Sequence, residues 1–346
     1  MLGYFNGYIL FPALEKLKKR EISNKLTELR EFELLDQKTQ IEKQKKLLYH
    51  FFIFCQKNIP YYQELFKKYN FEPVKIFKDL NYVQTLPILS KEIIKEYSDQ
   101  LKKPWGGFHE RKTGGSTGQS VLFYYDQQGL DWTSAINLYS LELAGKMPHH
   151  KDCHISSELG IEPPNIKYRL IDWIKLFSQN RKRLMIESFS EKNLKRNYEE
   201  LKKMRPYLLQ GHPSSAYAIA SYIKEHNISP KKLCDVFEPS GEMLTQKIVE
   251  RIESYLKCKV VNRYGNAEFG VMAHSLPNHD YKKLKIFRRA FYIEPTSQSN
   301  IIVTGITNLG FPLIRYDTGD IGTVKEEKDG LYLYDIQGRV HDLETI

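Results

Sequence analysis

The strongest constraint on the fold is an alternation of two hydrophobic periods between residues 191 and 265. The segment EKNLKRNYEELKKMRPYLLQGHPSSAYAIASYIKEH has helix-like spacing, then a short strand-like run, then helix-like spacing again. The next segment, CDVFEPSGEMLTQKIVERIESYLKCKVVNRYG, indicates strand, loop, helix and strand. Because strands that alternate with helices are joined by crossover connections, this pattern predicts an α/β fold with a largely parallel sheet.

The flanking regions have different patterns. Residues 1–100 are mostly helical in their spacing, with a break at Pro60 and a helix that restarts after a Ser90 cap. From Phe291 onward the chain shows five short strand-like runs, FYIEP, NIIVTGI, LIRYD, IGTVK and LYLYDIQ. We therefore expect a helical region (1–100), an α/β core (101–290) and a β-rich subdomain (291–337).

Composition excludes some functional classes. The 346 residues are 41% hydrophobic, as expected for a globular protein, and carry a formal net charge of +10. Much of the excess lies in KLKKR (16–20) and KKLKIFRR (282–289). We interpret these runs as a solvated lysine-rich surface and expect no nucleic-acid partner, since no aromatic-interleaved motif accompanies them. An anionic substrate, nucleotide or carrier would also be attracted.

Location is predicted from the cysteines and from the N-terminus. Four widely spaced cysteines form no CxxC pair, which together with the lack of an export signal predicts a reducing cytoplasm. No apolar run approaches the roughly 20 residues of a membrane span. The segment MLGYFNGYILFPALEKLKKR starts apolar and ends basic, the reverse of a signal peptide. It either packs on its own domain, which we favour, or makes a peripheral membrane contact.

Four glycine-containing loops each follow a strand-like run: RKTGGSTGQS (111–120), EPSGEM (238–243), RYGNAEFG (263–270) and RYDTGDIG (315–322). Such loops at the carboxyl ends of strands are where open α/β sheets bind ligands. Glycine lets successive backbone N–H groups converge on a phosphate, and hydroxyls add donors. Together the loops predict a ligand with a ring, hydroxyls, phosphates and a metal, which ATP with Mg²⁺ provides.

In this order the loops resemble the adenylate-forming superfamily of acyl-CoA synthetases. The chain looks most like the phenylacetate–CoA ligase branch, including members found in capsule and surface-polysaccharide gene clusters. NIPYYQELF, LPILSKEII and QGHPSSAYAIASYI extend the resemblance along essentially the whole chain. It implies the large N-terminal α/β domain of such an enzyme, with mixed sheets flanked by helices and a small β-rich subdomain. Residues 338–346 would then begin a hinge to a C-terminal domain that is missing here.

The resemblance implies a nucleotide site. Its phosphate cradle would be formed by Gly114, Gly115, Ser116, Thr117 and Gly118. The residues on the adenine side would be Ser240, Gly241, Glu242, Tyr264 and Gly265, with the Tyr264 ring stacked on the base. Asp320 would accept hydrogen bonds from the ribose hydroxyls, and Arg339 would contact the ribose or the α-phosphate. Glu268 would bind Mg²⁺, so that Glu268, Thr117 and Arg339 are the implied catalytic residues.

Several of these residues have a structural alternative. Tyr264 could be a packing residue at the end of a sheet, and Asp320 could cap a turn. Glu242 could be a charge that answers a helix dipole, and Arg315 a structural ion-pair residue. His212 could line the acyl pocket, although a packed or solvated histidine is the reading we favour. His149, His150 and His154 have no further ligand at a convincing spacing, so no zinc site is predicted.

The sequence also departs from the family pattern. In the family, a lysine beyond the Gly–Arg pair contacts the reacting carboxylate and the α-phosphate, whereas this sequence stops eight residues after Gly338. The hinge aspartate position appears as His341, with Asp342 next to it. We therefore expect an ATP-dependent ligase that forms acyl-AMP from a carboxylic acid, for transfer to coenzyme A, a carrier protein or an amine. The alternative is a catalytically degenerate nucleotide-binding scaffold.

Overall fold

The computed structural model describes residues 1–112, 121–156, 166–276 and 280–337. The chain divides into two compact units. The parallel-sheet unit comprises Met1–Lys19, Ser140–Arg263 and Ser275–Tyr281, and the antiparallel-sheet unit comprises Arg20–Tyr139, Tyr264–His274 and Lys282–Ile346. Each unit is described by itself below.

The parallel-sheet unit is built on five strands in the order β4, β3, β5, β6, β7, and each neighbouring pair is parallel. The strands are Asp152–Ser156 (β3), Arg181–Met185 (β4), Leu208–Gly211 (β5), Val236–Pro239 (β6) and Lys259–Val260 (β7). Helices connect successive strands, so the α/β pattern predicted from the alternating periods is confirmed.

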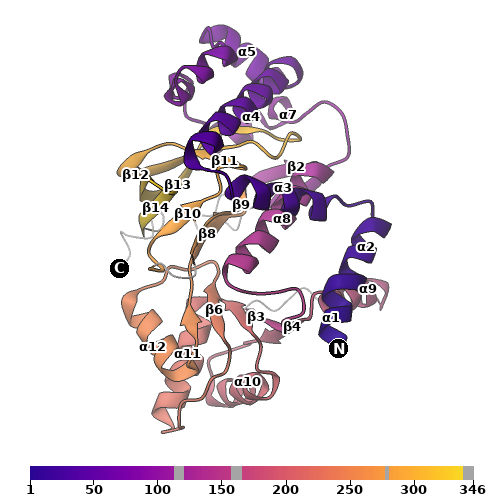
Figure 1. Cartoon of the computed structure of the whole chain (residues 1–346), viewed down its shortest axis with the longest axis vertical. Coiled ribbons are helices and arrows are strands. Elements are labelled where there is room, and N and C mark those ends of the chain that lie inside the picture. Colours follow the sequence, from indigo (N-terminus) through magenta and orange to yellow (C-terminus); the bar gives the residue numbers. More distant parts are fainter. Residues whose placement is uncertain (113–120, 157–165, 277–279, 338–346) are drawn as a thin grey trace. The chain divides into compact units, whose positions relative to one another are not determined.

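The helices of this unit (Figure 1) are Leu2–Phe5 (α1), Asn6–Leu10 (η1), Phe11–Leu17 (α2), Ile166–Ser178 (α9), Glu191–Met204 (α10), Pro213–Glu225 (α11) and Gln246–Leu256 (α12). Of these, α10, α11 and α12 contribute apolar side chains to the core that covers the sheet. Helix α12 shows the principle: Val249, Ile252 and Leu256 recur at a spacing of three and four and are buried. The Thr245 side chain accepts a hydrogen bond from the Ile248 N–H and caps that helix.

The antiparallel-sheet unit holds seven strands in the order β11, β12, β13, β14, β10, β9, β8. They are Arg263–Asn266 (β8), Gly270–Ser275 (β9), Leu284–Ile286 (β10), Phe291–Ile293 (β11), Thr296–Gly305 (β12), Leu313–Glu327 (β13) and Gly330–Gln337 (β14). Strands from Phe291 onward are present as predicted, with one correction. LIRYD and IGTVK were expected as two short strands, but both belong to β13, because pairing with β12 resumes beyond a bulge.

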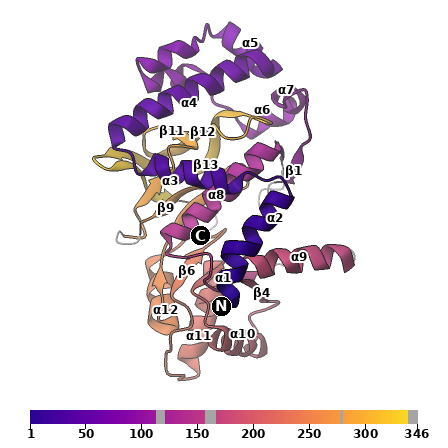
Figure 2. The same cartoon turned by 45° about the vertical axis from the view of Figure 1, so that its right-hand side comes forward.

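Helices and a hairpin complete this unit. They are Ile22–Glu33 (α3), Gln37–Asn58 (α4), Pro60–Lys68 (α5), Pro73–Phe77 (η2), Leu80–Thr85 (η3), Lys91–Glu96 (α6), Ser98–Leu101 (α7), His109–Lys112 (β1), Leu122–Tyr125 (β2) and Gln127–Leu143 (α8). Helix α4 lies across β11 and β12 (Figure 2). The buried Gln44 amide attaches α4 to the sheet by donating to the Arg288 and Phe291 carbonyls, at 3.0 and 2.8 Å. The predicted Ser90 cap of α6 is confirmed.

Arg315 is the main polar connection inside this unit. Its guanidinium donates to both oxygens of Glu294, at 2.6 and 2.9 Å, and both residues are buried. It also donates to the carbonyls of Gln84 and Leu86, which lie at the end of η3. Between the two alternatives for Arg315, the structure therefore favours an ion-pair residue that holds the strand β13.

Other described features bear on location and on metals. All four cysteines are free and buried, and burial raises the pKa of the Cys153 thiol to about 12. In the part of the chain that the structure describes, no helix combines the length and apolar character needed to cross a bilayer. Nor do those residues contain a group of three or more His, Cys, Asp or Glu side chains suited to a metal ion.

We expect Arg315→Met to lower the free energy of unfolding by about 3–5 kcal/mol, because it leaves the Glu294 carboxylate buried without its partner. The measurement is urea denaturation followed by circular dichroism. The control is Lys75→Met, which breaks the exposed pair with Glu72 and should shift the unfolding midpoint little. Equal, small shifts in both variants would contradict a structural role for Arg315.

Candidate nucleotide site

Three polar side chains of the antiparallel-sheet unit meet beside strand β8. The Tyr264 hydroxyl donates to Asp320 Oδ2 at 2.8 Å and lies 3.3 Å from the Thr318 hydroxyl oxygen. Thr318 in turn donates to the Ile301 carbonyl at 2.9 Å, so its position is fixed by the sheet. Burial, followed by the Asp320 carboxylate, raises the pKa of Tyr264 well above its usual value, so this hydroxyl stays protonated.

A bulge in β13 places Asp320. Asp317 pairs with Ile302 and Ile321 pairs with Asn300, so β13 uses two residues more than β12 over this stretch. Gly319 has φ +77°, a left-handed conformation that glycine adopts without strain, and its N–H donates to Asp317 Oδ1 at 2.8 Å. The TGD sequence thus supplies the glycine that the bulge needs and an acid at its exit.

Glu268 lies in the turn between β8 and β9. The turn is tight because the two strands approach closely: a Cβ on Gly265 would collide with the Gly270 carbonyl oxygen. Gly270 has φ +74°, and the Asn266 side chain accepts the Phe269 N–H at 2.9 Å. The glycines of the RYGNAEFG segment are therefore required by the hairpin that carries Glu268.

The Glu268 carboxylate is 4% exposed and only half satisfied. Its Oε1 accepts a hydrogen bond from the buried Tyr316 hydroxyl at 2.8 Å. Its Oε2 is also buried and has no hydrogen-bond partner among the described residues. An unpaired carboxylate oxygen is costly to bury, and a hard divalent cation prefers such an oxygen as its ligand. Glu268 therefore fits the magnesium role that the family resemblance implies.

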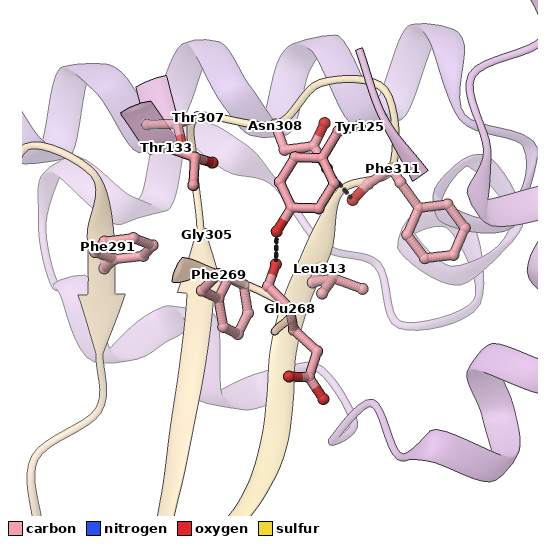
Figure 3. A pocket seen from close by; sticks show the side chains of 10 residues that line it. All are labelled: Tyr125, Thr133, Glu268, Phe269, Phe291, Gly305, Thr307, Asn308, Phe311 and Leu313. Atoms are coloured by element: carbon pink, nitrogen blue, oxygen red, sulfur yellow. Dashed lines mark hydrogen bonds between the residues drawn. The ribbon is translucent and has the colours of Figure 1, made fainter. Parts of the chain in front are cut away.

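Tyr125 of β2 (Figure 3) holds the backbone of the Glu268 turn. Its hydroxyl donates to the backbone carbonyl of Glu268 and lies 3.3 Å from that of Ala267. Burial raises the pKa of Tyr125 to about 12, which keeps this donor protonated. In Figure 3 the Glu268 carboxyl group points away from the tyrosine ring. The cavity between these side chains holds about 10 Å³, room for one water molecule at most.

The predicted phosphate loop lies outside the described residues: Gly114, Gly115, Ser116, Thr117 and Gly118 all fall within 113–120. Its two flanks are described. Strands β1 and β2 form an antiparallel pair in which Lys112 is opposite Leu122. Since β2 also carries Tyr125, the strand after the predicted loop is hydrogen-bonded to the Glu268 turn. Arg339, Gly338, His341 and Asp342 also lie outside the described residues.

The adenine-side loop belongs to the parallel-sheet unit. The Glu242 carboxylate accepts the Ser214 N–H at 2.9 Å and the Ser214 hydroxyl at 2.8 Å. Because Ser214 is in the first turn of α11, Glu242 answers that helix's positive end, one of the two roles considered for it. Gly241 has φ +76°, and a Cβ there would contact the His212 ring. The Ser240 N–H donates to the Gly211 carbonyl at 2.9 Å.

The structure brings together Tyr264, Gly265, Glu268 and Asp320 within one unit, as strand and turn neighbours. Sequence reasoning missed Tyr125, Tyr316 and Thr318, which bind the acids or the turn. Tyr316 and Thr318 lie within the RYDTGDIG segment, where alternation along a strand would have placed both with Asp320. Tyr125 had no comparable signal, because its partner is a backbone carbonyl.

Glu268→Gln should leave the free energy of unfolding unchanged or raise it by about 1 kcal/mol without ligands, because it removes a buried charge while the Tyr316 bond is kept. Thermal unfolding without ATP or Mg²⁺ measures this. The matched control is Glu33→Gln, which removes the buried charge that pairs with Lys285 at 3.0 Å and should destabilise the protein. Destabilisation of both variants alike would show that Glu268 is an ordinary structural acid.

No protein-family model matches this chain. Among curated proteins, it is 26% identical over 291 residues to Protein CapK of Staphylococcus aureus, covering 83% of this chain and 63% of CapK. It is 28% identical over 145 residues to indoleacetate–lysine synthetase of Pseudomonas savastanoi, covering 41% of this chain and 36% of the synthetase. The chain thus spans less than two thirds of the length of these curated relatives.

Among solved structures, 2-hydroxyisobutyryl-CoA ligase in a complex with R3-HIB-AMP superimposes with a TM-score of 0.69 and 16% identity, covering 89% of this chain and 69% of the ligase. An open conformation of the same ligase, with 2-HIB-AMP and CoA, gives a TM-score of 0.68 at 16% identity, with 89% and 76% coverage. At this identity the likeness concerns the fold, and the predicted α/β class with mixed sheets flanked by helices is confirmed. The sequence likeness to an indoleacetate–lysine synthetase and the fold likeness to a 2-hydroxyisobutyryl-CoA ligase agree with the resemblance found in the sequence.

Proposed function

We propose that this chain is the nucleotide-binding domain of an ATP-dependent ligase that activates a carboxylic acid as acyl-AMP. The observation that carries the proposal is the pair of acids in one unit. Asp320 is held by Tyr264 beside a bulge, and Glu268 is buried with one oxygen that has no hydrogen-bond partner among the described residues. An acid held in place, such as Asp320, suits hydrogen bonds from ribose hydroxyls. An acid with an oxygen left unpaired, such as Glu268, suits a metal ion that binds phosphate.

Each residue would have a defined part. Asp320 would accept the ribose hydroxyls, and Tyr264, fixed by its bonds to Asp320 and Thr318, would set the position of the base. Gly114, Gly115, Ser116, Thr117 and Gly118 would supply donors to the phosphates, and Arg339 would contact the ribose or the α-phosphate. Glu268 would hold Mg²⁺, which neutralises charge on the phosphate oxygens when bound. Tyr125 and Tyr316 would keep the Glu268 turn and carboxylate in place.

The finer assignment rests on likeness. We propose a phenylacetate–CoA ligase-like reaction with release of pyrophosphate, and coenzyme A, a carrier protein or an amine as the acyl acceptor. Two similar proteins are an indoleacetate–lysine synthetase and a 2-hydroxyisobutyryl-CoA ligase. The name of the first protein couples an acid with an amine, and the name of the second couples an acid with coenzyme A. The assay described below therefore compares both classes of acyl acceptor. A role in surface-polysaccharide synthesis is part of the same proposal.

We expect Mg²⁺–ATP to bind with a dissociation constant in the micromolar to millimolar range, roughly 4–8 kcal/mol of binding free energy. Isothermal titration calorimetry measures it. Asp320→Asn should weaken binding at least tenfold, because an amide offers one acceptor oxygen in place of two. Asp99→Asn, on the exposed side of α7, is the matched control and should bind as the parent does. Unchanged binding in Asp320→Asn would contradict the assigned ribose contact.

The role of Glu268 is tested by the metal dependence of the same titration. In the parent, replacing Mg²⁺ with EDTA should weaken ATP binding, whereas Glu268→Gln should bind ATP weakly with or without the metal. Glu33→Gln keeps Glu268 and should retain the Mg²⁺ effect. A full Mg²⁺ effect in Glu268→Gln would remove Glu268 from the proposed metal site.

Catalysis separates the ligase from the degenerate scaffold. The assay follows pyrophosphate release, together with hydroxamate formation when hydroxylamine traps the acyl-AMP, over a panel of aromatic and aliphatic acids. Coenzyme A and lysine are then compared as natural-type acceptors, through formation of the thioester or the amide. Acid-dependent pyrophosphate release that is lost in Glu268→Gln supports the ligase. Tight Mg²⁺–ATP binding without release by any acid, in the chain as given, supports the scaffold for this chain.

A further inference from the structure

The first helices of the parallel-sheet unit are attached through their small side chains. Gly3 and Gly7 face the turn at Pro148 and His149 so closely that a Cβ on Gly3 would lie 2.6 Å from the His149 carbonyl oxygen. A Cβ on Gly7 would collide with the Pro148 carbonyl in the same way. Only glycine permits this contact, and the two glycines are one helical turn apart. The glycine side of α1 and η1 is therefore the packed side.

Asn6 fixes this segment to helix α9. The buried Asn6 amide donates to the Phe177 carbonyl at 2.9 Å and to Asn180 Oδ1 at 3.0 Å. The Asn180 amide donates back to the Gly3 and Pro148 carbonyls, each at 2.9 Å. Because these bonds are partly buried and run in both directions, α1, η1 and the C-terminal end of α9 are held as one piece (Figure 1).

This attachment leaves the large apolar side chains outside. Leu2, Phe5 and Ile9, at helical spacing, are 62%, 48% and 59% exposed. On α9, Leu170 and Trp173 are 55% and 58% exposed, also three residues apart. We call these five side chains the apolar ridge. Helix α9 adjoins η1, so exposed large apolar side chains lie on two neighbouring helices, and such side chains mark an interaction surface.

Positive charge lies next to the ridge. Lys16, Lys18 and Lys19 are exposed at the end of α2, which continues directly from η1. The Lys175 ammonium of α9 has its pKa lowered by burial, and the positive charges of Arg183, Arg181 and Lys18 contribute to that lowering, against Asp172. Lys175 of α9 thus lies near Lys18 and near Arg181 and Arg183 of β4. The two arginines are paired with Asp152 and Asp172, so the exposed lysines at the end of α2 are the cations that the proposal uses.

We propose that this surface binds the chain peripherally to a lipid bilayer that contains anionic lipids. The proposal is independent of the nucleotide site, since none of its residues belongs to that site. An interfacial helix inserts apolar side chains between the headgroups while neighbouring lysines bind the lipid phosphates. The ridge supplies the first component, with an exposed tryptophan suited to the interface, and the lysine cluster supplies the second.

The form of the surface favours a bilayer over a protein partner. The apolar side chains stand out from the exposed sides of helices, so they suit a soft, planar partner. The acid on α9, Asp172, is paired with Arg183, so the exposed lysines at the end of α2 supply the positive charge that an anionic headgroup layer would attract. The alternative that the N-terminal segment only packs on its own domain accounts for Gly3, Asn6 and Gly7, and leaves Leu2, Phe5 and Ile9 unexplained.

The test is co-sedimentation of the chain with vesicles. Vesicles of equal parts phosphatidylcholine and phosphatidylglycerol should bind the chain, and vesicles of phosphatidylcholine alone should bind it much more weakly. Phe5→Ser with Ile9→Ser should reduce binding at least tenfold, and circular dichroism should show an unchanged fold. Leu34→Ser removes an 87% exposed leucine elsewhere and is the matched control, expected to bind as the parent does.

The charge component has its own pair of variants. Lys16→Glu with Lys18→Glu should reduce binding at least tenfold, since each lysine beside an anionic leaflet contributes about fivefold. Lys67→Glu with Lys68→Glu makes the same charge change at the end of α5 and should reduce binding far less. If both double variants lose binding equally, net charge alone explains adsorption and the proposal is overturned.

Depth of insertion distinguishes a docked ridge from loose adsorption. In a Trp105→Phe background, brominated phospholipids should quench the fluorescence of Trp173, while buried Trp132 contributes a constant signal. Vesicle binding without quenching would overturn the proposal. So would a concentration-dependent dimer, detected by light scattering, that Phe5→Ser with Ile9→Ser disrupts while vesicle binding persists.

Discussion

The candidate site depends on strand β13, which is anchored at Arg315, where its polar segment begins. Arg315 has φ +53°, a left-handed conformation that costs free energy for a residue with a side chain. Its guanidinium makes up for this by bonding Glu294 and the backbone at the end of η3. The backbone of Arg315 and Asp317 also exchanges hydrogen bonds with Leu89. Tyr316, Thr318 and Asp320 take their positions from this anchored segment.

The two acids of the site differ in how fully their carboxylate oxygens are hydrogen-bonded, and this difference bears on the roles proposed for them. Asp320 is hydrogen-bonded to Tyr264, and its backbone N–H lies 3.2 Å from the Thr318 hydroxyl. Glu268 is buried with one oxygen that has no hydrogen-bond partner among the described residues, although Tyr316 and Tyr125 hold its carboxylate and its backbone. Glu33 and Asp152 each also have one such oxygen, but both acids are paired with a cation, Lys285 and Arg181 respectively. The hydrogen bond that the Glu268 carboxylate accepts comes from the neutral Tyr316 hydroxyl, which agrees with the cation proposed for this site.

The sequence predicted helices and strands correctly where a hydrophobic period continued over many residues. The parallel sheet, helix α12 and the strands after Phe291 were predicted in this way, and the structure contains them. The errors of the prediction lie where local conformation depends on distant partners. LIRYD and IGTVK were separated at the TGD residues because glycine and aspartate indicate a turn, whereas β12 and β14 pair on either side of the bulge and keep one strand. The domain boundaries at residues 100, 290 and 337 remain predictions.

By itself the sequence predicted which residues would carry the proposed chemistry: the ordered glycine loops, the acids Glu268 and Asp320, and Tyr264. A motif can do this because a turn needs glycine and a metal or a ribose needs a carboxylate, whatever surrounds them. Only the tertiary structure decided which of these side chains have hydrogen-bond partners. Hydrogen bonds from Tyr316 and Tyr125 to the Glu268 turn join residues 48 and 143 positions apart. Burial and partnership across such separations depend on packing, and no local pattern encodes them.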